Sequence, residues 1–208
     1  MMISLLALIG VTVLISYKGT QDHMFFTKNE FHIGSIQSGE RFRMFSSGFL
    51  HVDFQHLFFN MFTLYLFAPY VVSHFSSTYF FLLYFGSLLS GSMLTLYFHK
   101  KEYNYRAVGA SGAVTGIIYS AILIEPHIYM YGFIPGYVFG FLYLLASIYG
   151  MKTKRDNIGH VAHFGGAIGG FVITLIREPH IFTEQTLTVV ALLVPIVVLF
   201  FLEKTNKL

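Results

Sequence analysis

The stretch RAVGASGAVTG, residues 106–116, decides how this chain must fold. It leads from a charged loop into an apolar run and surrounds Ser111 with glycine and alanine. Small side chains leave a helix backbone bare, so that a second helix can approach it closely. A serine side chain is short, so its hydroxyl meets a side chain on another helix only where the two backbones nearly touch. We therefore expect Ser111 to lie at a close helix–helix contact.

The composition is that of an integral membrane protein. Of 208 residues, 55% are hydrophobic and only 11% are charged, whereas a soluble domain carries about 25% charged residues. The absence of cysteine excludes disulfides, thiolate metal sites and cysteine nucleophiles. The net charge of +3 is small and spread over the loops, so nothing indicates a nucleic-acid partner.

Apolar runs near the ~20 residues that cross a bilayer recur along the chain. They predict an all-α polytopic bundle, one domain over residues 1–208, with a core of residues 1–177 and an extra C-terminal span. The third, fifth and seventh runs are apolar all round and are expected to be plain spans, whereas the second, fourth and sixth carry polar or very small residues. The first loop, residues 18–49, is expected to lie half-sunk in the membrane interface. The seven predicted spans are residues 2–17, 54–72, 79–98, 108–124, 129–149, 158–176 and 187–202.

Polar residues inside a span are costly and usually functional. His56 and Asn60 are four residues apart, so on a helix they share one face and can converge on one point. Both donate hydrogen bonds without carrying a charge. His51 lies just before this helix. The alternative is that these groups only cap a neighbouring loop.

The sixth span begins with IGHVAHFGGAIGGF, residues 158–171. Gly166 and Gly170 form one small-residue stripe behind His163, Gly165 and Gly169 form an adjacent one, and the fourth span offers a matching set of glycines and alanines. Histidine beside a serine hydroxyl acts as a general base, which makes the serine an activated nucleophile. Each residue alone is also compatible with simple packing, but Ser111, His163, His56 and Asn60 together favour a hydrolytic site.

These motifs resemble the rhomboid intramembrane serine proteases. GASG, residues 109–112, matches the family's GxSG motif around the nucleophile. HLFFN, residues 56–60, matches its HxxxN motif, and HFGGAIGG, residues 163–170, matches its catalytic histidine with the following glycines. The order of the three motifs also fits, each on an alternate span.

The resemblance implies a function for each motif. It implies a catalytic dyad of Ser111 and His163, without an acidic third member, that hydrolyses peptide bonds in or near transmembrane segments of other membrane proteins. It implies an oxyanion hole from the Ser111 backbone N–H and the side chains of His56 and Asn60. No cofactor or metal is expected, and the oligomeric state stays open. The supporting residues are His51, Gly109, Gly112, Gly166, Gly170 and Arg43.

Two positions depart from the family pattern. The first loop usually carries Trp-Arg, but here Phe42 precedes Arg43. Many members carry a tyrosine four residues after the nucleophile, where it packs on the histidine ring, but this chain has Thr115. Some other residue must then hold His163, and a bulky aromatic such as Phe164 or Tyr119 is the expected substitute.

The orientation in the membrane is predicted in two opposite ways. Basic residues lie mainly in the loops after the first, third and fifth spans, which by the positive-inside tendency puts the Ser111 end of its span in the cytoplasm. The family topology opens the site to the outer face instead, and we follow the family. A bacterial plasma membrane is the expected location.

Two other functions stay open. The departures would suit a proteolytically inactive relative that binds membrane clients. A transporter or haem protein could use His51, His56, His99 and His163, although only the histidine count suggests it. A zinc protease is disfavoured, because His160 and His163 come without an HExxH motif or a carboxylate partner.

Overall fold

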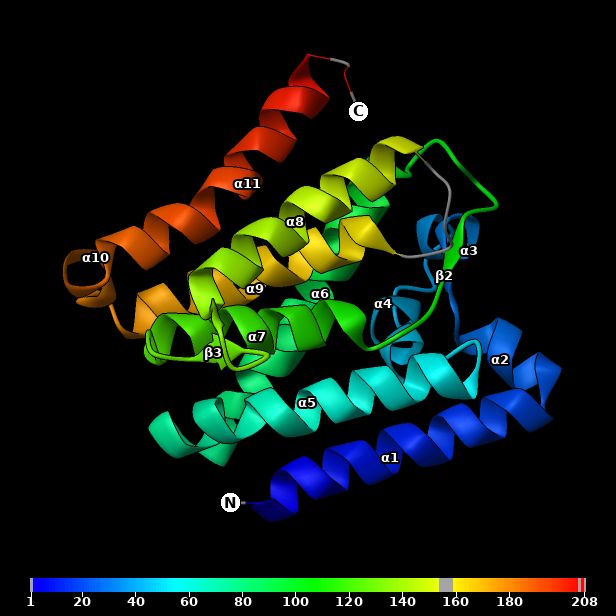
Figure 1. Cartoon of the computed structure of the whole chain (residues 1–208). Coiled ribbons are helices and arrows are strands. Elements are labelled where there is room, and N and C mark those ends of the chain that lie inside the picture. Colours follow the sequence, from blue (N-terminus) through cyan, green and yellow to red (C-terminus); the bar gives the residue numbers. More distant parts are fainter. Residues whose placement is uncertain (1, 154–158, 206, 208) are drawn as a thin grey trace.

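The computed structural model describes residues 2–153, 159–205 and 207, and over these residues the protein is an all-α bundle (Figure 1). Ile158, the first residue of the predicted sixth span, lies outside the described residues. The long helices are α1 (Met2–Gln21), α5 (Phe54–His74), α6 (Ser77–Phe98), α7 (Ser111–Ile124), α8 (Gly136–Thr153), α9 (His160–Arg177) and α11 (Thr186–Lys204).

Five of these helices are long and apolar enough to cross a membrane within the described ranges. They are α1, α5, α6, α9 and α11. The C-terminal helix predicted over residues 187–202 is therefore present as α11, which packs against α8. Because five of its described helices are long and apolar enough to cross a membrane, the chain is a multi-pass integral membrane protein.

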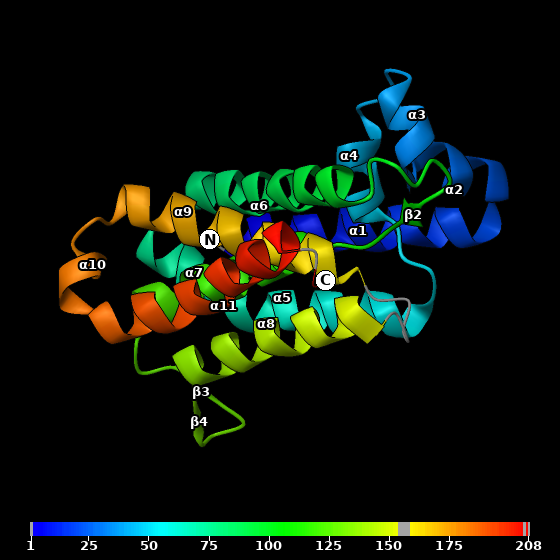
Figure 2. The same cartoon turned by 90° about the horizontal axis from the view of Figure 1, so that it is seen from above.

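The helix α7 is the centre of the bundle. Every residue from Gly112 to Leu123 is buried, and the view from above places α7 and α9 between α6 on one side and α8 on the other (Figure 2). With 14 residues, α7 is only about 21 Å long at 1.5 Å per residue, shorter than the ~30 Å hydrocarbon core. Ser111 at its first turn therefore lies below the membrane surface when the other end of α7 reaches the opposite interface.

Glycine contacts hold α9 against both of its neighbours. A methyl group added at Gly166 would overlap the carbonyl oxygen of Gly112, and one at Gly170 would overlap that of Gly116. On the adjacent stripe, a methyl at Gly165 would lie 2.6 Å from the Cα of Gly91 in α6. The close contact of the fourth and sixth spans is thus as predicted, but the second stripe faces α6, a helix expected to be a plain span.

The predicted fourth and fifth spans both begin too early. Helix α7 begins at Ser111 rather than at residue 108, because Gly109 has φ +131° and breaks the helical path. Residues 129–135 form a hairpin of β3 (Tyr129–Met130) and β4 (Ile134–Pro135), with positive φ at Tyr131 and Gly132. Pro135 lacks an N–H and ends this strand, so α8 begins only at Gly136.

The first loop is an ordered cap over one end of the bundle. It packs its own small core around Phe31, Ile33, Ile36 and Met44. Its strand β1 pairs with β2 (Arg106–Ala107), directly before the Ser111 motif. Its elements are α2 (His23–Asn29), β1 (Phe31–His32), α3 (Ile33–Gln37), α4 (Arg43–Ser46) and the 3-10 turn η1 (Ser47–Phe49), and the short α10 (Ile181–Glu184) precedes α11.

Candidate active site

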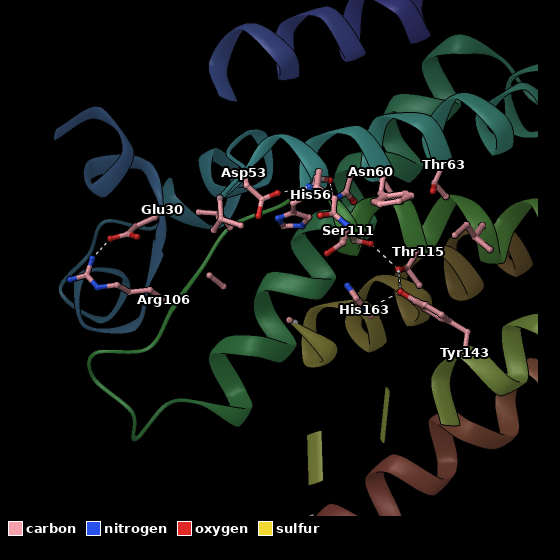
Figure 3. Close-up of a pocket in the computed structure, with 18 of the residues that line it drawn as sticks. Glu30, Asp53, His56, Asn60, Thr63, Arg106, Ser111, Thr115, Tyr143 and His163 are labelled. Atoms are coloured by element: carbon pink, nitrogen blue, oxygen red, sulfur yellow. Dashed lines mark hydrogen bonds and ion pairs between the residues drawn. The ribbon is translucent and has the colours of Figure 1, made fainter. Parts of the chain in front are cut away.

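A cavity of about 990 Å³ opens between α5, α7, α8 and α9. It collects the polar residues that the sequence singled out on three separate spans (Figure 3). The residues that concern the chemistry are His56, Asn60, Ser111, Thr115, Tyr143 and His163. Ser111 and His163 thus line one common cavity, from α7 and α9 respectively.

Ser111 is the first residue of α7, next to the point where the helix backbones touch. Ala110 is the N-cap residue of α7, and its side chain accepts no hydrogen bond from the first backbone N–H groups of that helix. Unpaired N–H groups at a helix N-terminus attract negative charge. The nucleophile candidate therefore lies beside backbone donors suited to an oxyanion.

His51 fixes the backbone immediately before Ser111. Its Nε2 accepts a hydrogen bond from the Ala110 N–H at 3.3 Å, and its Nδ1 lies 2.9 Å from the Ser16 hydroxyl. Because Ser16 donates its own proton to the Phe49 carbonyl at 2.8 Å, His51 must donate to Ser16 and stay neutral. Burial, and secondarily the neighbouring His56, lower the pKa of His51 to about 3. His51 thus contacts the backbone directly before Ser111.

His56 and Asn60 face the cavity from the first two turns of α5, as the four-residue spacing predicts. Asp53 caps this helix, and its Oδ1 accepts the His56 N–H at 2.7 Å. The His56 ring lies 4.9 Å from the His51 ring, edge to face, and fills the space where Gly109 lacks a side chain. Asn60 donates one amide proton to the His56 carbonyl at 2.9 Å and keeps a second one.

His163 is held by a tyrosine from α8. The Tyr143 hydroxyl lies 2.9 Å from His163 Nδ1, and the two rings stack at 5.7 Å between centroids with an interplanar angle of 24°. The expectation that Phe164 or Tyr119 does this was wrong. Phe164 is fully buried in the core, and the Tyr119 hydroxyl donates to the Gly140 carbonyl at 2.9 Å. Phe164 directly follows His163 on α9, so its side chain points about 100° away from that of His163 around the helix.

Arg43 lies in the first loop, at a distance from the dyad along the chain and in the fold. It is buried and donates to Glu40 at 2.6 Å and to the carbonyls of Thr27 and Glu30 at 2.7 and 3.1 Å. The buried Glu30 carboxylate in turn pairs with Arg106 of β2. Arg43 therefore holds together the loop whose strand β1 pairs with β2 just before Ser111.

Within the described ranges, no group of three or more His, Cys, Asp or Glu side chains could hold a metal ion. His99 stacks on Tyr105 at 3.8 Å and lies 3.1 Å from Glu102, at the end of α6. Of the four histidines considered for haem, His56 and His163 line the cavity and His99 does not.

Two residues around the cavity were not predicted from the sequence. Tyr143 lies in a span that is apolar all round and was expected to be plain, and the only indication of a partner for His163 was that Thr115 lacks an aromatic ring. Asp53 is an aspartate three residues before the His56 backbone N–H, which is a typical helix cap.

Comparison with known protein families identifies one domain in the chain. A family model of the rhomboid domain matches residues 38–179, which include the candidate site from His51 to His163. No curated protein sequence matches the chain. Since the match spans more than half of the 208 residues, the chain belongs to the rhomboid family.

Proposed function

We propose that this rhomboid is an active intramembrane serine protease that cleaves peptide bonds in or near transmembrane segments of other membrane proteins. The observation that carries the proposal is the common cavity that Ser111 and His163 line together with His56 and Asn60. Ser111 attacks the substrate carbonyl, and His163 takes its proton and returns it to the leaving amine.

The oxyanion is stabilised by neutral donors. The Ser111 backbone N–H, the free amide proton of Asn60 and the His56 ring are the candidate donors around the cavity. Each well-placed donor of this kind contributes about 3–4 kcal/mol to the transition state in a water-poor site.

Water and substrate must both reach Ser111. The cavity includes polar groups from Glu30, Asp53 and Arg106 at the loop end, which suits entry of water from that side. A substrate helix must unwind locally, since its carbonyls are otherwise hydrogen-bonded within the helix. Segments with helix-weakening residues and small side chains at the cut are the expected substrates.

The test is cleavage of a single-span substrate by the purified protein in liposomes. We expect products from the wild type and from Ser73→Ala, a control serine whose hydroxyl only bonds the Tyr70 carbonyl at the exposed end of α5. Ser111→Ala should yield none. Binding of the substrate without cleavage by the wild type would favour the inactive, client-binding alternative instead.

A further inference from the structure

Three contacts connect His163 with Ser111 through the hydroxyl groups of Tyr143 and Thr115. The Thr115 hydroxyl donates to the backbone carbonyl of Ser111 at 2.8 Å. The same Thr115 oxygen lies 3.4 Å from the Tyr143 hydroxyl, which lies 2.9 Å from His163 Nδ1. Figure 3 shows these contacts as one continuous line across the cavity wall.

Two donor directions are compatible with these contacts. In both, the Thr115 proton is committed to the Ser111 carbonyl, because a carbonyl only accepts. In the first direction Tyr143 donates its single proton to Thr115 and its oxygen accepts from His163, so that Nδ1 of His163 carries the proton. In the second direction Tyr143 donates to His163 Nδ1, and the buried Thr115 has no donor from Tyr143. Only the first direction lets His163 act as a base through Nε2.

We propose that Tyr143, together with Thr115, is the positioning residue that holds His163 in the Nδ1–H tautomer, in which Nε2 is unprotonated and can take the Ser111 proton. The inference rests on the proposed protease function. The carboxylate of a serine triad fixes the tautomer and the orientation of its histidine. Here a neutral phenol from α8 does both, by its hydroxyl and by its stacked ring.

This arrangement explains why Thr115 is compatible with an active site. An aromatic residue at that position would itself pack on the histidine ring, as in many members of the family. Thr115 is small and almost fully buried, so it leaves room for the Tyr143 ring to reach His163 from the neighbouring helix. The two residues therefore act as one unit, and changing either should disturb His163.

The test compares Tyr143→Phe with Tyr119→Phe in the full chain. Both variants keep the ring and lose one hydroxyl bond of 2.9 Å, but only Tyr143 bonds to His163. We expect Tyr143→Phe to lower kcat about tenfold with KM unchanged, as the loss of one well-placed hydrogen bond implies. Tyr119→Phe should keep kcat within about twofold of the wild type.

A second readout does not depend on activity. Nitrogen-15 NMR of histidine-labelled protein in lipid reports which ring nitrogen of His163 carries the proton, with the signal assigned by its loss in His163→Ala. We expect Nδ1–H in the wild type and in Tyr119→Phe, and a changed signal in Tyr143→Phe. If Tyr143→Phe does not fold, Thr115→Val takes its place, since it keeps the stacked ring and breaks the same chain.

The outcomes separate the two proposals. If the wild type cleaves nothing but shows the Nδ1–H tautomer and loses it in Tyr143→Phe, the positioning role holds and the protease function fails. An Nε2–H tautomer in the wild type would overturn the positioning role. So would a Tyr143→Phe protein that matches Tyr119→Phe in both kcat and the His163 signal.

Discussion

Replacing Gly166 by alanine should separate the two helices that carry the dyad. The new methyl would lie 2.6 Å from the carbonyl carbon of Gly112 and overlap the oxygen of that carbonyl. Carbon atoms in van der Waals contact lie about 3.5–4.0 Å apart, so α7 and α9 must move apart by about 1 Å. Neither backbone can yield locally, because both groups belong to regular helices.

The displacement would change the distance between Ser111 and His163. Gly112 follows Ser111 in the chain, and Gly166 lies about one turn after His163 on the same helix. Misplacement of reacting groups by about 1 Å costs about 100-fold in rate, which corresponds to about 2.7 kcal/mol. Overpacking should also lower the free energy of unfolding by about 1–3 kcal/mol.

The assay measures kcat/KM for cleavage in liposomes and the thermal midpoint of each variant. Gly10→Ala is the matched control, since it also adds a methyl within a helix but meets nothing within 4 Å. Gly170→Ala creates a similar clash with Gly116 one turn further from the dyad, and should lose less activity for a similar loss of stability. If Gly166→Ala keeps wild-type activity and thermal midpoint, the close contact of α7 and α9 is not what brings the dyad together.

Two further predictions concern the residues around Ser111. The folded-state pKa of His51 is about 3, below its ordinary 6.5, so the unfolded chain takes up the proton first and stability falls as the pH falls below 6.5. From pH 6.5 to 5 this loss is about 1.6 kcal/mol. In denaturant titrations at the two pH values, His51→Gln should lose less folding stability than the wild type, by the contribution of His51. Equal losses in both proteins would contradict the low pKa of His51. Gly109→Ala combines φ +131° with a methyl 2.7 Å from His56 Cε1. It should lower kcat about tenfold by displacing His56, beyond the effect of Gly39→Ala, which has φ +110° but open space. Equal activities of these two variants would show that His56 need not stay in place.

Short polar motifs were readable in the sequence because their spacing is local. Residues four apart on a helix share a face, so the positions of His56 and Asn60 follow from their spacing. The glycines after His163 predict a close helix contact in the same way, independently of the rest of the fold. The hairpin at residues 129–135 was missed because an apolar run of tyrosine, isoleucine and phenylalanine suits a strand and a span alike. Only Gly132 and Pro135 marked the break.

Contacts between helices far apart in the sequence could not be predicted in the same way. Tyr143 is 20 residues from His163, and nothing in its own span distinguishes it from the neighbouring Phe141. Which rings meet is decided by the rotation of α8 against α9, which depends on packing along both helices. The pairing of β1 with β2 likewise joins Phe31 to Ala107 across two spans, and no local pattern encodes it.

The central claim is that His163 activates Ser111 as a nucleophile. It is tested most directly by treating the protein in liposomes with a fluorophosphonate and locating the adduct by peptide mass spectrometry. We expect one adduct on Ser111 in the wild type, strongly reduced in His163→Ala and unchanged in Gly10→Ala. An unlabelled Ser111 in the wild type, or equal labelling of Ser111 in His163→Ala, would contradict it.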